Sequence, residues 1–158
     1  MVEIREATPD DVDAIYGLIK ELAVYEKAGN EVAISAEQLK MDGFGENPLF
    51  FAFVATIKTK VVGMALGYIR YSTWKGKCLF LEDIVVNQQH RRKGIGKKLF
   101  EALLKKAQKE NFNLMSWQVL EWNAPAIAFY KKYPTEFDKE WINCKLNKEQ
   151  IKLINESL

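Results

Sequence analysis

The segment Cys78–Lys106 decides the fold of this chain, and it reads CLFLEDIVVN, then QQHRRKGIG, then KKLFEALLKK. Its first ten residues are mostly apolar, with β-branched side chains at 84–86 and an interruption at Glu82 and Asp83, which predicts a buried strand. From Ile95 onward the apolar residues recur at helical spacing, so a helix is expected there. A basic loop with two glycines joins the strand to the helix, and this combination predicts an anion-binding site.

The composition of the loop narrows the choice of anion. Gly94 and Gly96 let consecutive backbone N–H groups turn inward, beside the partial positive charge of the helix N-terminus. Four side chains add full positive charges: Arg91, Arg92, Lys93 and Lys97. No third glycine follows Gly96, which excludes a dinucleotide fingerprint, and Lys98 stands where a Walker loop needs a hydroxyl residue. The alternative is a strand-to-helix turn that binds no ligand.

Composition excludes several classes of protein. The chain has 158 residues, 48% of them hydrophobic and 28% charged, so we expect one globular domain over 1–158. Its net charge of +2 gives no general reason to expect a nucleic-acid or membrane partner. Two cysteines and the single histidine, His90, do not match the usual spacing of a zinc site, so no metal is expected. The polar start and the lack of a long apolar run favour a cytoplasmic protein.

The rest of the chain alternates between strand and helix patterns. Strands are predicted over 2–7, 50–57, 60–71, 113–121 and 141–146, and helices beginning near Thr8, Ser35, Asn123 and Ile151. No repeat or linker interrupts this order. The sequence therefore predicts a mixed α/β (α+β) fold.

The pattern R-x-x-G-x-G, directly after a strand, resembles the pyrophosphate loop of the GCN5-related N-acetyltransferase (GNAT) superfamily. Longer blocks are similar to its spermidine/spermine (diamine) acetyltransferase branch, which includes thialysine acetyltransferase-like members. These blocks are LIKELAVYE (18–26), DGFGENP (42–48), STWKG (72–76), LEDIVV (81–86) and EWNAPAIAFYKK (121–132). The resemblance covers nearly the whole chain.

The resemblance implies a single-domain fold with a mixed, mostly antiparallel central sheet flanked by helices, and a splayed central strand pair that binds acetyl-CoA. It implies direct transfer of an acetyl group from acetyl-CoA to a primary amine of a small di- or polyamine or a thialysine-like substrate. Two alternatives stay open. The acceptor could be a protein amine or an antibiotic, or the chain could be a CoA-binding module without turnover.

The resemblance also implies the residues that bind acetyl-CoA. The pyrophosphate loop comprises Arg91, Arg92, Lys93, Gly94, Ile95, Gly96 and Lys97. Backbone groups of Ile84, Val85 and Val86 would face the pantetheine and thioester, and one N–H there would polarise the carbonyl. Asn123 would contact the CoA arm, and Tyr130 would protonate the departing thiolate, for which a neutral phenol is suited. The alternative for 84–86 is a plain core strand. The alternative for Asn123 is an ordinary helix cap, and for Tyr130 it is a position in the core of a helix.

On the acceptor side, the resemblance implies that Glu82 draws the proton from the ammonium substrate through water and that Asp83 binds the substrate. Glu26 would add a third acid, and Trp74 and Trp141 would wall the pocket. Neighbouring strand residues point to opposite faces, so Glu82 and Asp83 can share a pocket only if the strand is locally distorted. The alternatives are structural salt bridges for the two strand acids and ordinary core positions for the tryptophans.

The chain departs from the family pattern at two places. Ser72 stands where polyamine acetylators of this branch carry an acid, which leaves room for a shorter amine. Tyr133-Pro134 replaces the glycine that usually follows two basic residues, so the approach to the last strand must differ. Relatives are homodimers that pair or exchange C-terminal strands, and 141–146 is the corresponding segment here.

Overall fold

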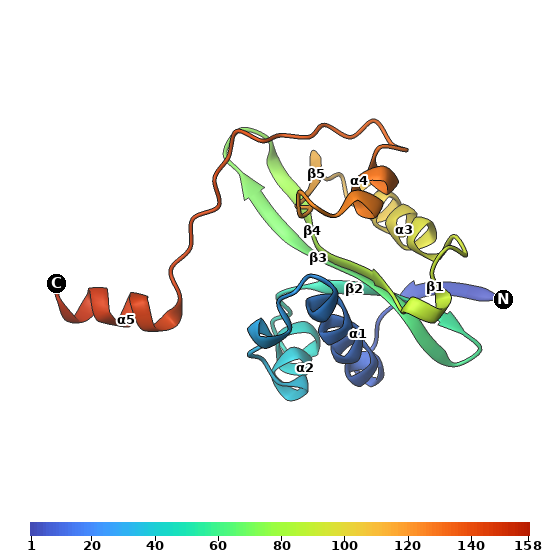
Figure 1. Ribbon diagram of the computed structural model, residues 1–158, viewed down its shortest axis with the longest axis horizontal. Coiled ribbons are helices and arrows are strands. Elements are labelled where there is room, and N and C mark those ends of the chain that lie inside the picture. Colours follow the sequence, from blue (N-terminus) through green and yellow to red (C-terminus); the bar gives the residue numbers. More distant parts are fainter. The chain divides into compact units, whose positions relative to one another are not determined.

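A five-stranded sheet forms the centre of residues 1–118. Its strands are β1 (Val2–Glu6), β2 (Phe51–Ile57), β3 (Lys60–Ser72), β4 (Gly76–Val86) and β5 (Leu114–Trp117), in that spatial order (Figure 1). Pairs β1–β2, β2–β3 and β3–β4 are antiparallel, whereas β4 and β5 are parallel. The computed structural model describes all residues 1–158, in two compact units, Met1–Gln118 and Val119–Leu158. The mixed, mostly antiparallel sheet predicted from the sequence is confirmed.

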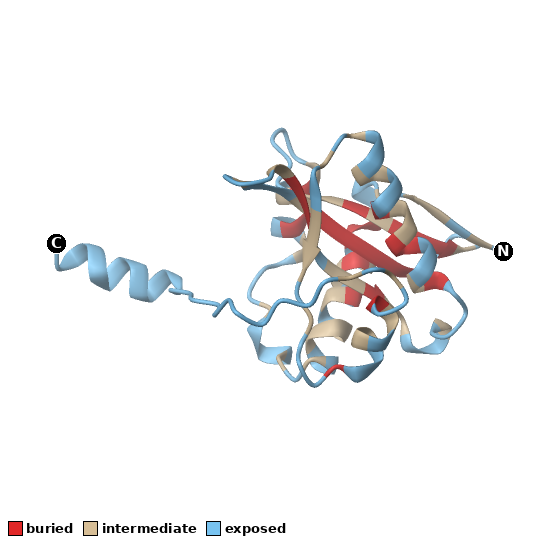
Figure 2. Cartoon of the chain, turned by 90° about the horizontal axis from the view of Figure 1, so that it is seen from above, coloured by how far each residue is buried: buried red, intermediate tan, exposed pale blue.

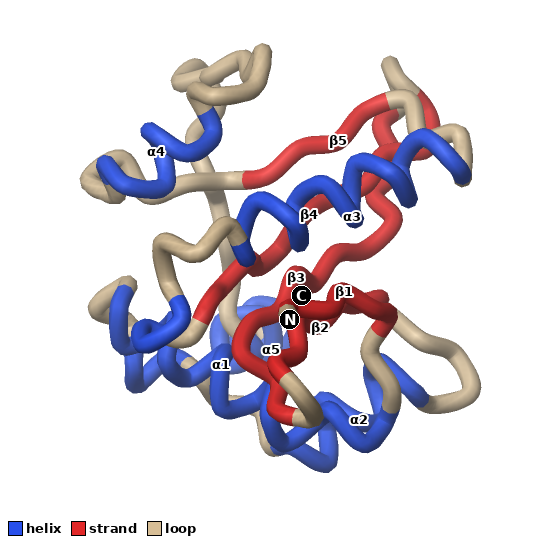
Figure 3. Tube along the Cα trace, turned by 90° about the vertical axis from the view of Figure 1, so that its right-hand side faces the viewer, coloured by secondary structure: helices blue, strands red, loops and turns tan.

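Helices cover both faces of this sheet. Helices α1 (Val12–Tyr25) and α2 (Ala36–Phe44) lie on one face, and α3 (Ile95–Lys109) lies on the other (Figures 1 and 3). Three short 3₁₀ turns, η1 (Pro9–Asp11), η2 (Gly29–Glu31) and η3 (Gln88–His90), complete the first unit. The predicted cap of α2 is present, because the Ser35 hydroxyl accepts a hydrogen bond from the Gln38 backbone N–H at 3.1 Å.

Each face of the sheet has its own apolar core. Beneath α1 and α2 the buried members are Val12, Ile15, Leu18, Leu39, Ala52, Val54, Met64, Leu66 and Val85. On the other face, α3 buries Ile95, Leu99, Phe100 and Leu103, and the Phe100 ring meets the edge of Trp117 with 5.3 Å between centroids. Buried positions follow the middle strands (Figure 2). Strand β4 is thus covered on both sides and held in place by both cores.

The second unit contains α4 (Ala124–Tyr130) and α5 (Lys148–Glu156). The predicted strand over 141–146 is wrong: these residues form no strand, and Trp141 and Ile142 are 75% and 87% exposed. Alternation in sequence creates a strand only when a neighbour satisfies its backbone groups, and no strand of this chain pairs with the segment. All of α5 is exposed as well (Figure 2).

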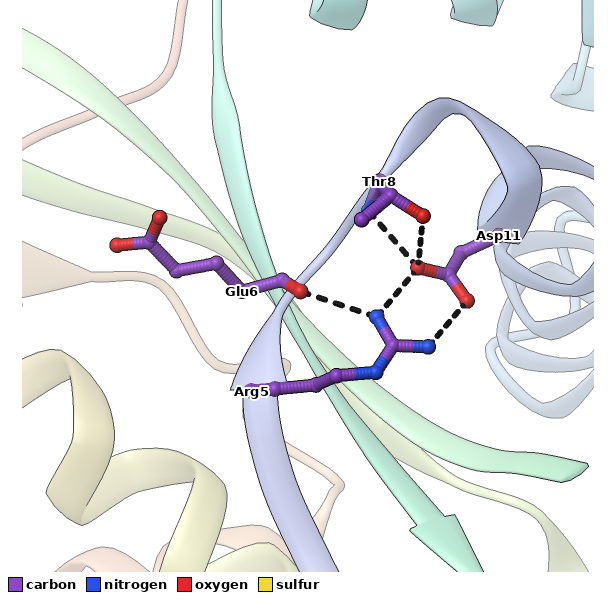
Figure 4. Close-up of polar contacts among 4 residues, drawn as sticks. All are labelled: Arg5, Glu6, Thr8 and Asp11. Atoms are coloured by element: carbon purple, nitrogen blue, oxygen red, sulfur yellow. Dashed lines mark hydrogen bonds and ion pairs between the residues drawn. The ribbon is translucent and has the colours of Figure 1, made fainter. Parts of the chain in front are cut away.

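A partly buried ion pair ties β1 to the start of α1 (Figure 4). Arg5 donates from Nη1 and Nη2 to the two carboxylate oxygens of Asp11, at 2.7 and 2.8 Å. The Thr8 backbone N–H donates to the same carboxylate at 2.8 Å, and the Thr8 hydroxyl donates at 3.1 Å. The Arg5 guanidinium, above all, lowers the pKa of Asp11 to about 2, since these bonds favour the charged form.

We expect Asp11→Asn to lower the free energy of unfolding by about 1–3 kcal/mol at pH 7, because the pair is bidentate and Asp11 is buried. A carboxyl with a lowered pKa stabilises the fold above its unfolded pKa, near 3.8, and this stability is lost as the pH falls toward 2. Urea unfolding of wild type and Asp11→Asn at pH 7 and pH 3 measures the difference in their free energies of unfolding. This difference should be smaller at pH 3. Asp13→Asn, at an exposed position of α1, is the control. A difference that stays constant between the two pH values would contradict this account.

Candidate active site

Glu82 is an extra residue in β4. Leu66 of β3 pairs with Asp83, but the next residue of β3, Gly67, pairs with Leu81, so Glu82 has no partner in the ladder. Such a β-bulge is the local distortion that the sequence required for two neighbouring acids to share a pocket. Asp83 faces the same side as its partner Leu66, which is the side covered by α1, and Glu82 is exposed.

Asp83 lies in an environment that disfavours its charge. Burial, and then the negative charges of Glu82 and Glu26, raise the pKa of Asp83 to about 6. Glu26 is the C-cap residue that directly follows α1, and burial also raises the pKa of its carboxyl. We call Glu26, Glu82 and Asp83 the acidic cluster. The structure therefore brings together the three acids that the sequence assigned to one pocket.

None of the three carboxylates has a cationic partner within the protein. Every ion pair of the structure involves other acids, and no hydrogen bond is made by the side chains of Glu26, Glu82 or Asp83. The alternative of a structural salt bridge is thus wrong for the strand acids. Burial, and next to it the charge of Glu82, also raises the pKa of the nearby Tyr68 phenol. The cluster therefore carries negative charge that no cation of the protein compensates.

Strand β4 extends beyond its parallel neighbour. Pairing with β5 ends at Leu81 and Trp117, so residues 82–86 of β4 have a strand partner only on the β3 side. Val85 is buried in the core beneath α1, while Ile84 and Val86 alternate with it and are partly buried. This is the predicted splay of the central strands. The unpaired edge offers backbone N–H and C=O groups in an extended row.

The loop after β4 has the backbone of an anion site. Arg92 and Gly94 adopt left-handed conformations, with φ of 60° and 75°, and Gly94 caps α3. The first hydrogen bond of α3 runs from the Lys98 N–H to the Gly94 carbonyl at 3.1 Å. The N–H groups of Ile95, Gly96 and Lys97 precede that bond and are not used within the helix. These features are those of an anion-binding loop at a helix N-terminus.

The four basic side chains of the loop behave differently. Arg91 donates from Nε to the Val86 carbonyl at 2.9 Å and lies 3.7 Å from the Glu21 carboxylate, so its charge is engaged within the protein. Lys93 donates to the Gln89 carbonyl at 3.2 Å. Lys97 pairs with Glu101 at 3.7 Å on an exposed surface, and Arg92 is exposed without a hydrogen bond or ion pair. Arg92 and Lys97 are therefore the charges most available to an incoming anion.

Sequence reasoning missed the anchor of this loop. Glu21 of α1 accepts a hydrogen bond at 2.9 Å from the Asn87 side chain and another at 2.9 Å from the Gln88 backbone N–H. The Tyr25 ring, one helical turn later, lies 5.2 Å from the Arg91 guanidinium. The only available signal was the spacing of Glu21 and Tyr25 on one helix face, which does not name a partner in the loop.

The remaining candidates are Trp74 of the first unit and three residues of the second unit. Trp74 is 83% exposed in the turn between β3 and β4. Asn123 and Tyr130 belong to the second unit, where they are 8% and 5% exposed. Asn123 caps α4 by accepting a hydrogen bond from the Ala126 N–H at 3.3 Å, and the Tyr130 ring meets the edge of Phe129 with 5.3 Å between centroids. Trp141 lies in the exposed segment before α5.

Two general features of the structure complete the description of the site. No group of three or more His, Cys, Asp or Glu side chains is arranged to hold a metal ion. None of the helices combines the length and the apolar character that a membrane span requires.

Comparison with known proteins identifies the class to which this fold and site belong. Residues 14–133 match the model of the acetyltransferase (GNAT) family, and the chain belongs to this family. An aminoglycoside N-acetyltransferase solved in complex with CoA has the same fold, with a TM-score of 0.75 at 19% identity over 92% of this chain and 95% of that one. The protein is an acetyl-CoA-dependent N-acetyltransferase.

Curated relatives lie in the branch that the sequence blocks indicated. Thialysine N-epsilon-acetyltransferase of Bos taurus is 42% identical over 138 residues, which are 82% of this chain and 81% of the relative. Spermidine/spermine N(1)-acetyltransferase-like protein 1 of Homo sapiens is 33% identical over 94% of this chain but only 23% of its own length. The assignment to the diamine acetyltransferase branch, including its thialysine-type members, is confirmed.

We expect Asp83→Asn to stabilise the fold by about 1–2 kcal/mol at pH 8, because it removes a charge that burial disfavours. A carboxyl with a raised pKa destabilises the fold above that pKa, near 6, and the penalty disappears as the pH falls below about 4. Urea unfolding at pH 8 and pH 4 tests the difference, and carboxyl NMR titration gives the pKa directly. Glu82→Gln should lower the pKa of Asp83, since one of its negative neighbours is gone. A wild-type pKa near 3.8 would refute this description of the cluster.

Proposed function

We propose that this enzyme acetylates a primary amine of a small diamine or a thialysine-like amino acid. The observation that carries the proposal is the acidic cluster, whose three carboxylates have no cationic partner in the protein. A bound ammonium group would compensate this negative charge. It would also lower the pKa of Asp83, so that its carboxyl is ionised at neutral pH. The 42% identity to a thialysine N-epsilon-acetyltransferase supports the same class of acceptor.

The turn at Ser72 favours a short acceptor over a long polycation. The Ser72 hydroxyl accepts hydrogen bonds from the backbone N–H groups of Trp74 and Lys75, at 3.2 and 3.1 Å. It thereby shapes the turn that exposes Trp74 and supplies no negative charge there. With one carboxylate fewer than the polyamine acetylators of this branch, the pocket has less charge to hold several ammonium groups at once.

On the cofactor side, the loop would hold the pyrophosphate of acetyl-CoA with the N–H groups of Ile95, Gly96 and Lys97. Arg92, Lys93 and Lys97 would add charge, while Arg91 and the left-handed Gly94 shape the loop. The free edge of β4 at Ile84, Val85 and Val86 would bind the pantetheine arm and polarise the thioester carbonyl. Asn123 would contact the same arm as well as capping α4.

In the reaction, Glu82 would accept a proton from the substrate ammonium through water while Asp83 and Glu26 hold the charged group. The neutral amine then attacks the thioester carbonyl, and the C–S bond breaks to release the CoA thiolate. Tyr130 would give its phenolic proton to that thiolate, and the surplus proton on the newly acylated nitrogen would restore the phenol, which leaves a neutral amide and the CoA thiol. Trp74 and Trp141 would bound the acceptor pocket.

We further propose that residues 1–158 act as one acetyltransferase domain and that the protein is a cytoplasmic homodimer. The family resemblance supports a dimer, and so do apolar side chains exposed in the second unit: Trp141, Ile142, Leu146, Ile151, Leu153 and Ile154. The soluble-type composition supports the location.

An amine panel tests the acceptor. We would follow CoA thiol release from acetyl-CoA with thialysine, lysine, putrescine, spermidine, spermine, an aminoglycoside and a peptide N-terminus. We expect the highest kcat/KM with thialysine or a short diamine. The acidic cluster can compensate the one ammonium group bound there, and the pocket lacks a further carboxylate at Ser72 for the additional ammonium groups of a long polyamine. A clear preference for spermine, the peptide or the aminoglycoside would overturn the proposed acceptor.

Glu82→Gln tests the base. Without this carboxylate the substrate must lose its proton unaided, so the pH–rate profile should shift toward alkaline pH, with a 10²–10⁴-fold lower rate at pH 7. The measurement is kcat/KM from pH 6 to 10 with the best amine of the panel. An unchanged profile would remove Glu82 from this role.

Tyr130→Phe tests the acid. The phenyl ring preserves the packing against Phe129, so the affinity for CoA should change less than threefold. Turnover should fall by about 10²-fold or more, because the thiolate then leaves without a proton donor. Calorimetric titration with CoA and steady-state kcat separate the two effects. Equal losses in affinity and turnover would contradict a proton-donor role.

A further inference from the structure

We propose that Glu21 is a positioning residue that sets the affinity for acetyl-CoA by holding the loop 87–96 in its binding conformation. The inference rests on the proposed role of that loop as the pyrophosphate site. Glu21 lies on α1, far from the loop in sequence, and its side chain is 29% exposed. Its polar contacts with the loop are made to Asn87, Gln88 and Arg91.

The Glu21 carboxylate fixes the first turn of the loop by three contacts. Oε2 accepts from the Asn87 side-chain amide at 2.9 Å, and Oε1 accepts from the Gln88 backbone N–H at 2.9 Å. Oε1 also lies 3.7 Å from the Arg91 guanidinium. Both oxygens are therefore used, and all three partners belong to the segment between β4 and α3.

Asn87 transmits this constraint into the turn. Its side-chain oxygen accepts from the Gln89 N–H at 3.2 Å, and its backbone carbonyl accepts from the His90 N–H at 2.9 Å, which closes η3. Its own N–H donates to the Val62 carbonyl of β3 at 2.9 Å. Because Glu21 takes up the amide N–H₂ group, the side-chain oxygen of Asn87 is oriented toward Gln89.

Arg91 is held from three sides. Its Nε bonds to the Val86 carbonyl, its guanidinium faces Glu21, and the Tyr25 ring lies 5.2 Å away. Glu21 and Tyr25 stand one turn apart on α1, so the same helix face supplies the charge and the ring. The next residues, Arg92 and Gly94, must keep positive φ for the N–H groups of α3 to face an anion.

Glu21→Ala would leave the Asn87 amide, the Gln88 N–H and the Arg91 guanidinium without this acceptor. In Glu21→Gln the amide nitrogen must face either the Asn87 amide or the Gln88 N–H, donor against donor, and the charge opposite Arg91 disappears. The loop then samples other conformations, and binding of acetyl-CoA must restore the competent one at a cost in affinity. Chemistry on the bound substrate is not affected.

The test compares wild type, Glu21→Gln, Glu21→Ala and the control Glu31→Gln, which removes the same charge from an exposed position in η2. Calorimetry with CoA gives the affinity, and kinetics with the best amine of the panel give kcat and both KM values. We expect Glu21→Gln to raise the Kd for CoA and the KM for acetyl-CoA 10- to 30-fold. The value of kcat and the KM for the amine should stay within twofold, and the control should match wild type.

A double-mutant cycle that combines Glu21→Gln with Asn87→Ala tests whether Glu21 acts on the loop through Asn87. The two substitutions should be strongly non-additive in the Kd for CoA, because they break the same connection. Additive effects, an unchanged Kd in Glu21→Gln, or parallel losses in kcat and both KM values together with a lower Tm would each overturn the proposal. Absence of CoA binding by wild type would instead refute the cofactor loop itself, and with it both proposals.

Discussion

The β-bulge at Glu82 is the constraint on which the rest of the site depends. One residue without a partner in β4 changes the alternation of side chains, so that Asp83 faces α1 while Leu81, opposite Gly67, faces the other way. The parallel pairing with β5 ends at Leu81, immediately before the bulge. An acid on the α1 side and a free strand edge therefore adjoin the same local distortion of the backbone.

Helix α1 supports both charged regions of the site. Glu26, at its end, adds negative charge to the acidic cluster, and Glu21, about one and a half turns earlier, neutralises Arg91 and orients the loop. The charge of one acid is uncompensated and that of the other is compensated. Glu26 adds to the negative charge that no cation of the protein balances, whereas Glu21 is paired with Arg91. The exposed Arg92 and Lys97 therefore carry the charge of the loop that faces solvent.

Local patterns predicted most of the first unit. Glycine positions and apolar spacing identified the loop and α3. Two acidic neighbours in an apolar strand could share a pocket only if the strand was distorted, and the structure has such a distortion at Glu82. Predictions failed where the structure of a segment or the role of a residue depends on a partner that is distant in the sequence. Residues 141–146 alternate but have no strand to pair with, β5 is shorter than its apolar pattern, and Glu21 resembles any surface acid until the loop is folded against it.

The bulge also affects how such an enzyme can evolve. Because Glu82 has no partner in the ladder, its deletion would keep Leu81 opposite Gly67 and Asp83 opposite Leu66. The fully buried Leu79 and Leu81 would then keep their faces, and both cores would stay intact. Descendants of this chain can therefore exchange or lose this one acid while they keep the scaffold, so the acceptor can change faster than the fold.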